Sequence, residues 1–251
     1  MQQAARIGLA SAAALSFAAL AALTNCGGTS GERPRPYVSG GTGGSTSTGL
    51  NCDDAVVPEN GIVTDFQDWK SPRWGSTDGL YGTIYRYSDS DSNMTAAVEA
   101  AGTETFALHA TGSVVDSSYG GVGLGFLVCT TVAKFSQIQF DIMGSSPGCD
   151  LELQVKTYDQ QPTSDSAGGG CDSNAGDCYQ FPVKKQVVDL STPIDDFTTF
   201  TVPFADIPDW SDDTATQVVG LQWQWTGTHV ELDAGAGCPI DVMITNVKFL
   251  P

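Results

Sequence analysis

The stretch Val219-Gly-Leu-Gln-Trp-Gln-Trp225 alternates apolar and polar side chains. Successive side chains of a β-strand point to opposite faces of its sheet, so the alternation predicts a strand with one buried and one open side. The set assigned to the core is Val219, Leu221, Trp223 and Trp225, and the opposite set is Gln222 and Gln224. The stretch therefore indicates a sheet that packs one face on a core and presents amides on the other.

The same period of two recurs along the chain, and no convincing amphipathic helix accompanies it. Clusters of Gly, Pro, Asp and Ser separate the alternating segments, as turns separate short strands. Many short strands without helices are typical of an all-β antiparallel β-sandwich or jelly roll, and we expect that fold. The expected strands are Ile62–Phe66, Phe106–Thr111, Val122–Val128, Ser136–Met143, Leu151–Tyr158, Gln186–Leu190, Thr198–Phe204, Val218–Trp225 and Ile240–Phe249.

Several short motifs follow one another in a recognisable order. They are Gly61-Ile-Val-Thr-Asp-Phe-Gln-Asp-Trp69, Ala107-Leu-His-Ala-Thr-Gly112, Tyr119-Gly-Gly-Val-Gly-Leu-Gly-Phe126, Phe135-Ser-Gln-Ile-Gln-Phe-Asp-Ile-Met-Gly144, Phe200-Thr-Val-Pro-Phe-Ala-Asp-Ile207 and Val242-Met-Ile-Thr-Asn-Val-Lys-Phe249. In this order they resemble the jelly-roll, galactose-binding-like carbohydrate-binding modules of exported bacterial lipoproteins. The resemblance implies a sandwich that binds a polysaccharide. It also implies a structural calcium near the last strand, although Thr245-Asn246 stands where the family carries Asp-Asp or Asp-Asn.

The charge balance excludes one class of partner. Asp and Glu number 29 against 11 Lys and Arg, for a formal net charge of −18. Nucleic-acid binding depends on Lys and Arg that displace counterions from phosphates, so we expect no nucleic acid as a partner.

The N-terminal fifth of the chain has the features of an export and anchoring signal. Residues 1–25 combine Arg6 with an Ala- and Leu-rich run, which is typical of a signal peptide. The ending Leu23-Thr-Asn-Cys26 resembles a lipobox, and we expect a lipid on Cys26. Residues 26–51 are rich in Gly, Ser and Thr and predict a flexible tether before a jelly-roll domain at 52–251.

These features predict a lipid-anchored protein of the bacterial cell envelope, at the outer membrane or cell surface. The alternative is an ordinary signal peptide followed by an unmodified cysteine.

The remaining cysteines predict disulfides. Apart from Cys26 there are six, and an even number in an exported chain argues for three bridges. Cys171 and Cys178 flank a short segment of one Gly-rich loop, so we expect them to pair with each other.

The polar sides of two predicted strands form the candidate carbohydrate site. Sugars present hydroxyls at their edges and C–H patches on their faces, so a site needs amide or carboxylate groups beside an aromatic ring. The candidate residues are Gln154, Lys156, Tyr158, Gln222 and Gln224, with the loop residue Trp210 as a second ring. A merely solvated sheet face and, for Trp210, a hydrophobic loop anchor are the alternatives.

Evidence for a metal or for catalysis is thin. Asp65 and Asp68 offer hard oxygen ligands for a structural calcium, or they are ordinary surface acids; we expect no other cofactor. Glu231-Leu-Asp-Ala234 resembles the paired carboxylates of jelly-roll glucanases, but Gly235 begins the segment where those enzymes carry a further acid. His109 is expected to be a strand residue with satisfied hydrogen bonds.

Three functions follow in order of preference. The first is a membrane-tethered, non-catalytic polysaccharide-binding lipoprotein. The second is a surface polysaccharide hydrolase or lyase of the same fold, and the third is a structural or adhesion domain without a small ligand. Fold alone does not choose among them.

Overall fold

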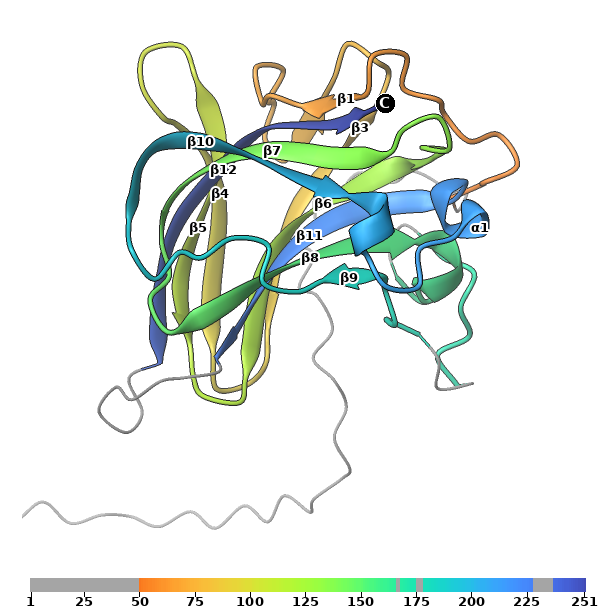
Figure 1. Cartoon of the computed structure of the whole chain (residues 1–251). Helices are drawn as coiled ribbons and strands as arrows, with labels where there is room; N and C mark the ends of the chain where they lie inside the picture. The colour runs from red at the N-terminus through yellow and green to blue at the C-terminus, as the bar shows by residue number, and fades with distance from the viewer. Residues whose placement is uncertain (1–49, 166–167, 175–177, 228–236) are drawn as a thin grey trace, which may run out of the picture. The chain divides into compact units, whose positions relative to one another are not determined.

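Two antiparallel sheets face one another in the described part of the chain (Figure 1). The computed structural model describes residues 50–251 apart from 166–167, 175–177 and 228–236. The first sheet has the strand order β10-β7-β12-β5-β4, with β1 paired to β12, and is called the β12 sheet. The second has the order β2-β3-β6-β11-β8-β9 and is called the β11 sheet. This architecture confirms the expected all-β antiparallel sandwich.

The strands range from two to 13 residues in length. The β12 sheet contains β1 (Ile62–Thr64), β4 (Asn93–Ala100), β5 (Phe106–Val114), β7 (Gln137–Ser145), β10 (Ile194–Pro203) and β12 (Cys238–Leu250). The β11 sheet contains β2 (Arg73–Gly75), β3 (Tyr81–Ser88), β6 (Tyr119–Thr130), β8 (Cys149–Thr157), β9 (Val183–Lys184) and β11 (Val218–Gly227). Helical turns occur at Tyr158–Gln160, Phe204–Asp206 and α1 (Asp212–Ala215). Across the described residues, no helix has the length and apolar character needed to cross a membrane.

The core lies between the two sheets and is built by the inward side chains that alternation predicts. Trp223 and Trp225 of β11 are fully buried. Trp223 meets Phe140 of β7 edge to face, with ring centroids 5.5 Å apart, so this contact joins one sheet to the other. On β8 the predicted inward residues Leu151, Leu153 and Val155 are also buried.

The structure corrects the predicted strands in two regions. Alternation did not identify β2, β3 and β4, and the last of these is Ala-rich and gains its strand geometry by pairing along its whole length with β5. The expected strand Gln186–Leu190 is wrong. Gln186 has a φ of 50°, in the left-handed region that interrupts a strand, and the shorter β9 pairs with β8 instead.

Three disulfides close the fold, as the cysteine count predicts. The expected local pair Cys171–Cys178 is confirmed, with Cα atoms 5.6 Å apart. Cys149–Cys238 joins the beginning of β8 to the beginning of β12 and thus links the two sheets, and Cys52–Cys129 ties the segment before β1 to β6. The two long-range bridges span sequence separations of 77 and 89 residues, which local spacing alone does not predict.

We predict that Trp223→Ala lowers the free energy of unfolding by about 3–5 kcal/mol, because it leaves a cavity where the two sheets meet. The measurement is urea unfolding under oxidising conditions. Thr163→Ala, in an exposed loop, is the control and should stay within about 0.5 kcal/mol of the wild type. A loss of less than about 1 kcal/mol for Trp223→Ala would contradict the role given to this ring.

Candidate functional site

The outward side chains of β3, β6, β11 and β8 form a polar face on the β11 sheet. Antiparallel pairing sets them in rows that run across the strands. One row, the Gln222 row, aligns Tyr85, Gly123, Gln222 and Gln154. The Tyr85 hydroxyl donates to Gln222 Oε1 over 2.8 Å, and Gln222 Nε2 donates to Gln154 Oε1. The row is therefore a continuous chain of hydrogen bonds from β3 to β8.

The next row, the Gln224 row, repeats this arrangement two residues along each strand. It aligns Tyr87, Gly121, Gln224 and Glu152. The Tyr87 hydroxyl donates to Gln224 Oε1 and Gln224 Nε2 donates to Glu152 Oε2, each over 3.2 Å. The other carboxylate oxygen of Glu152 lies 3.7 Å from Lys185 Nζ. Burial raises the pKa of both tyrosine hydroxyls, so both stay protonated and donate at neutral pH.

Glycines in β6 make these rows geometrically feasible. A Cβ at Gly123 would lie 2.5 Å from the hydroxyl end of Tyr85, and one at Gly121 would lie 2.6 Å from that of Tyr87. Any side chain at these positions would push the tyrosines away from β11. The absence of side chains lets each ring extend over β6 and reach the glutamine of the strand beyond.

A third row borders the Gln222 row and ends at Lys156. It aligns Thr83, Gly125, Gly220 and Lys156. The Lys156 stem covers Gly220, whose Cβ would lie 3.3 Å from Lys156 Cδ. Only 8% of Lys156 is exposed, and burial lowers its pKa to about 8.

The structure brings four of the six predicted carbohydrate-binding residues together. Gln154, Lys156, Gln222 and Gln224 share the polar face, as their strand parity predicts. The two rings of the face come from Tyr85 and Tyr87, which the sequence analysis did not identify. Two sequence patterns could have indicated these tyrosines: the alternation Tyr85-Arg-Tyr87 and the glycine run Gly121-Val-Gly-Leu-Gly125.

The other two predicted residues lie elsewhere. β8 ends at Thr157, and Tyr158 begins a helical turn, where its ring lies over Gly170. Trp210 stacks on Phe204 with ring centroids 4.0 Å apart, which fits the alternative of a hydrophobic loop anchor. Neither Tyr158 nor Trp210 therefore takes part in the rows of the polar face.

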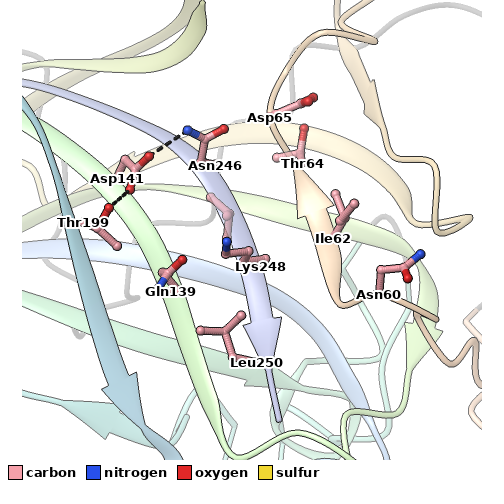
Figure 2. A pocket seen from close by; sticks show the side chains of 11 residues that line it. Asn60, Ile62, Thr64, Asp65, Gln139, Asp141, Thr199, Asn246, Lys248 and Leu250 are labelled. Carbon is pink, nitrogen blue, oxygen red and sulfur yellow. Dashed lines mark hydrogen bonds between the residues drawn. The ribbon is translucent and has the colours of Figure 1, made fainter.

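A shallow groove of about 500 Å³ lies on the outer side of the β12 sheet, and Figure 2 shows its lining. Asp141 accepts hydrogen bonds there from Thr199 Oγ1 over 2.6 Å and from Asn246 Nδ2 over 2.7 Å. The candidate calcium ligand Asp65 lines this groove and accepts a hydrogen bond from the backbone of Gln67, whereas Asp68 is exposed outside it. In the described ranges no group of three or more His, Cys, Asp or Glu side chains is arranged to hold a metal, and the calcium stays a prediction.

His109 is the strand residue that the sequence analysis expected. Its Nδ1 lies 3.0 Å from Glu99 Oε2 and its Nε2 lies 2.7 Å from Asp241 Oδ1, so one ring bridges three strands. The carboxylates Glu231 and Asp233 of the resemblance to glucanases lie outside the described residues.

Comparison with known proteins finds similarity in fold. No protein-family model and no curated protein matches the chain. The family 11 carbohydrate-binding module of a cellulosomal cellulase of Clostridium thermocellum aligns at 12% identity and a TM-score of 0.46, over 75% of this chain and 92% of that one. Another solved structure is a family 11 module of that organism in complex with a β-1,3-1,4-mixed-linked tetrasaccharide. It aligns at 13% identity and a TM-score of 0.46, over 76% of this chain and 94% of that one.

A third solved structure contains the CBM22-1-GH10 modules of a Clostridium thermocellum endo-1,4-β-D-xylanase with xylohexaose. It aligns at 10% identity and a TM-score of 0.39, over 77% of this chain and 29% of that one. Such values say nothing of what this chain binds.

The contacts of His109 predict a pH-dependent stability. Burial lowers its pKa, and the hydrogen bonds to Asp241 and Glu99 raise it by more, so the pKa lies above the usual 6.5. A group whose pKa is raised by folding contributes its full stabilisation at a pH below its pKa in the unfolded state. This contribution is lost as the pH rises through its pKa in the folded state. We expect the difference in Tm between wild type and His109→Gln to be larger at about pH 5.5 than at about pH 8.5. Equal differences at the two pH values would show that the two contacts do not favour the charged ring.

Proposed function

We propose that this protein binds a polysaccharide on the polar face of the β11 sheet without cleaving it. The observation that carries the proposal is the pair of parallel hydrogen-bonded rows, in which tyrosine rings lie beside amide and carboxylate groups. A glutamine side chain offers two N–H donors and two acceptor lone pairs, and each row uses only part of this capacity. Gln222 is only 6% exposed, so the donors and acceptors available to the hydroxyls of a sugar are mainly those of the half-buried Gln154 and Gln224. The half-buried tyrosine rings suit the C–H faces of the sugar.

The rows also make the face rigid before any ligand arrives. In each row the tyrosine hydroxyl is hydrogen-bonded to the glutamine of β11, and that glutamine is hydrogen-bonded to the next side chain of the row, on β8. Binding to side chains that are already ordered avoids much of the entropy loss that weakens association. The three strand spacings from β3 to β8 extend over about 14 Å, so a row is long enough for more than one sugar ring.

The composition of the rows favours binding over hydrolysis. Glycoside hydrolysis commonly uses two carboxylates on opposite sides of the scissile bond. The Gln222 and Gln224 rows contain one carboxylate, Glu152, and Gln224 and Lys185 engage its two oxygens. A neutral row of phenol and amides beside it is suited to holding hydroxyl groups.

We further propose that the domain is held at the bacterial cell envelope, at the outer membrane or cell surface, by a lipid on Cys26. The support is the signal-like run of residues 1–25, the Leu23-Thr-Asn-Cys26 ending and the Gly-, Ser- and Thr-rich segment after it. Residues 1–49 lie outside the described residues.

We predict that Tyr87→Ala and Gln224→Ala each weaken polysaccharide binding at least tenfold, about 1.4 kcal/mol, because each variant breaks the Gln224 row. The measurement is affinity electrophoresis in gels that contain a panel of soluble polysaccharides, with assays of reducing-sugar release on the same samples. Both side chains lie outside the core between the sheets but are half-buried, so binding is measured well below the melting temperature of each variant. Thr201→Ala, exposed on the β12 sheet, is the matched control and should bind like the wild type.

Two outcomes would contradict this proposal. If the wild type is retarded by no polysaccharide, the face has another purpose. If reducing sugar is released and Tyr87→Ala stops the release, the protein is an enzyme.

The anchor is tested separately by Cys26→Ser. We expect the wild type in the membrane fraction with the mass of an acylated N-terminus, and the variant in the soluble fraction without acyl groups. An unacylated, soluble wild type would show that Cys26 is not lipidated.

A further inference from the structure

Lys156 lies on the polar face but takes part in neither the Gln222 row nor the Gln224 row. Glycines at both central positions of its row leave a hollow, and the Lys156 side chain lies across it toward Tyr85. Lys156 Nζ lies 4.9 Å from the ring centroid of Tyr85 and 5.5 Å from that of Phe181. Its ammonium group is thus held between two aromatic rings at the border of the Gln222 row.

The ammonium group has no direct anionic partner among the described residues. In the described part of the chain no acceptor lies within hydrogen-bonding distance of Lys156 Nζ and no carboxylate within 4.0 Å, and Asp165 acts on it only through space. Asp165 itself accepts a hydrogen bond from the Tyr179 hydroxyl over 3.2 Å. A buried cation without a hydrogen-bonded anion is costly to desolvate, and cation–π contacts offset only part of this cost.

The other lysine near the rows differs in this respect. Lys185 is largely exposed and lies 3.7 Å from Glu152, so its charge is already paired. Of the cations that the structure describes on the polar face, Lys156 is therefore the one whose charge an incoming ligand can balance.

We infer that the polysaccharide bound on this face carries an anionic group, a carboxylate or a sulfate ester, on the sugar that contacts Lys156. This inference rests on the proposed function. An ammonium group has three N–H donors and no acceptor, so a ligand oxygen satisfies it, and an anionic oxygen also balances its charge. The hydrogen-bonded rows beside it would bind the hydroxyls of the same polysaccharide.

The net charge of −18 does not oppose such a contact. At physiological ionic strength, exposed charges more than about 8 Å apart are largely screened, whereas a partly buried pair in contact is screened much less. The local ammonium therefore outweighs the distant carboxylates for a group that touches it.

The first test compares polymers of different charge by affinity electrophoresis. Polygalacturonate supplies carboxylates, a carrageenan supplies sulfate esters, and an unsubstituted galactan is neutral. We expect the wild type to bind at least one acidic polymer tenfold or more tightly than the galactan. Which acidic polymer is retained identifies the anionic group.

Lys156→Met keeps a long, unbranched stem over Gly220 and removes the charge. We expect it to lose the preference for the acidic polymer and to retain any binding of the neutral one. Lys184→Met is the matched control because Lys184 lies on the neighbouring β9 and pairs with Asp206 at 3.8 Å. It removes the same charge from the protein and should leave the preference intact.

A pH titration of the wild type tests the inference even if Lys156→Met folds poorly. An ammonium with a pKa of about 8 loses its charge as the pH rises through that value, so affinity for the acidic polymer should fall between about pH 7 and pH 9. Affinity for a neutral polymer should stay constant over the same range.

The outcomes separate this inference from the proposed function. Binding of neutral polymers only, or equal binding of neutral and acidic polymers, would overturn the inference and leave polysaccharide binding standing. An acidic preference that survives in Lys156→Met, or that does not change between pH 7 and pH 9, would also overturn it. Failure of every polymer to bind would overturn the proposed function as well.

Discussion

The strict alternation of β11 is the constraint on which the rest of the molecule depends. Trp223 and Trp225 point into the space between the sheets, while Gln222 and Gln224 point outward from the same strand. A shift of one residue would turn both indoles away from the space between the sheets and turn both amides into it, so the core specifies the register of the strand very strongly. The same register sets the outward amides opposite their partners on β6 and β8. The hydrophobic core therefore positions the polar face without touching it.

The glycines of β6 convert this register into a continuous surface. Tyr85 and Tyr87 belong to β3, with β6 between them and the glutamines of β11. Only a strand without outward side chains at Gly121 and Gly123 allows the phenols to cross it. Glycine weakens a strand, because it adds no cross-strand packing and costs more backbone entropy. Here the tyrosine rings occupy the space that side chains of β6 would have filled.

The chemistry of the face changes along β8. Glu152 and Gln154 take part in the hydrogen-bonded rows, whereas Lys156 lies near two aromatic rings and has no direct charge partner among the described residues. The loop that follows β8 returns through the Cys171–Cys178 bridge to place Phe181 beside Lys156. A face with hydrogen-bonding rows over most of its extent and an ammonium group at one border suits a polysaccharide with both hydroxyl and anionic groups.

The sequence by itself determined the fold class, the local disulfide and, for strands such as β8 and β11 that alternation identified, the side on which each residue lies. These follow from the period of two and from short spacing, which are local properties: parity alone assigned Trp223 to the core and Gln154 to the open face. Only the tertiary structure decided which strands are neighbours. Tyr85 precedes Gln222 by 137 residues, and their contact depends on long-range pairing through β6 that no local pattern encodes. Alternation likewise did not predict that β8 ends at Thr157. The alternating pattern continues through Tyr158 in the sequence, whereas the backbone turns into a helical segment there.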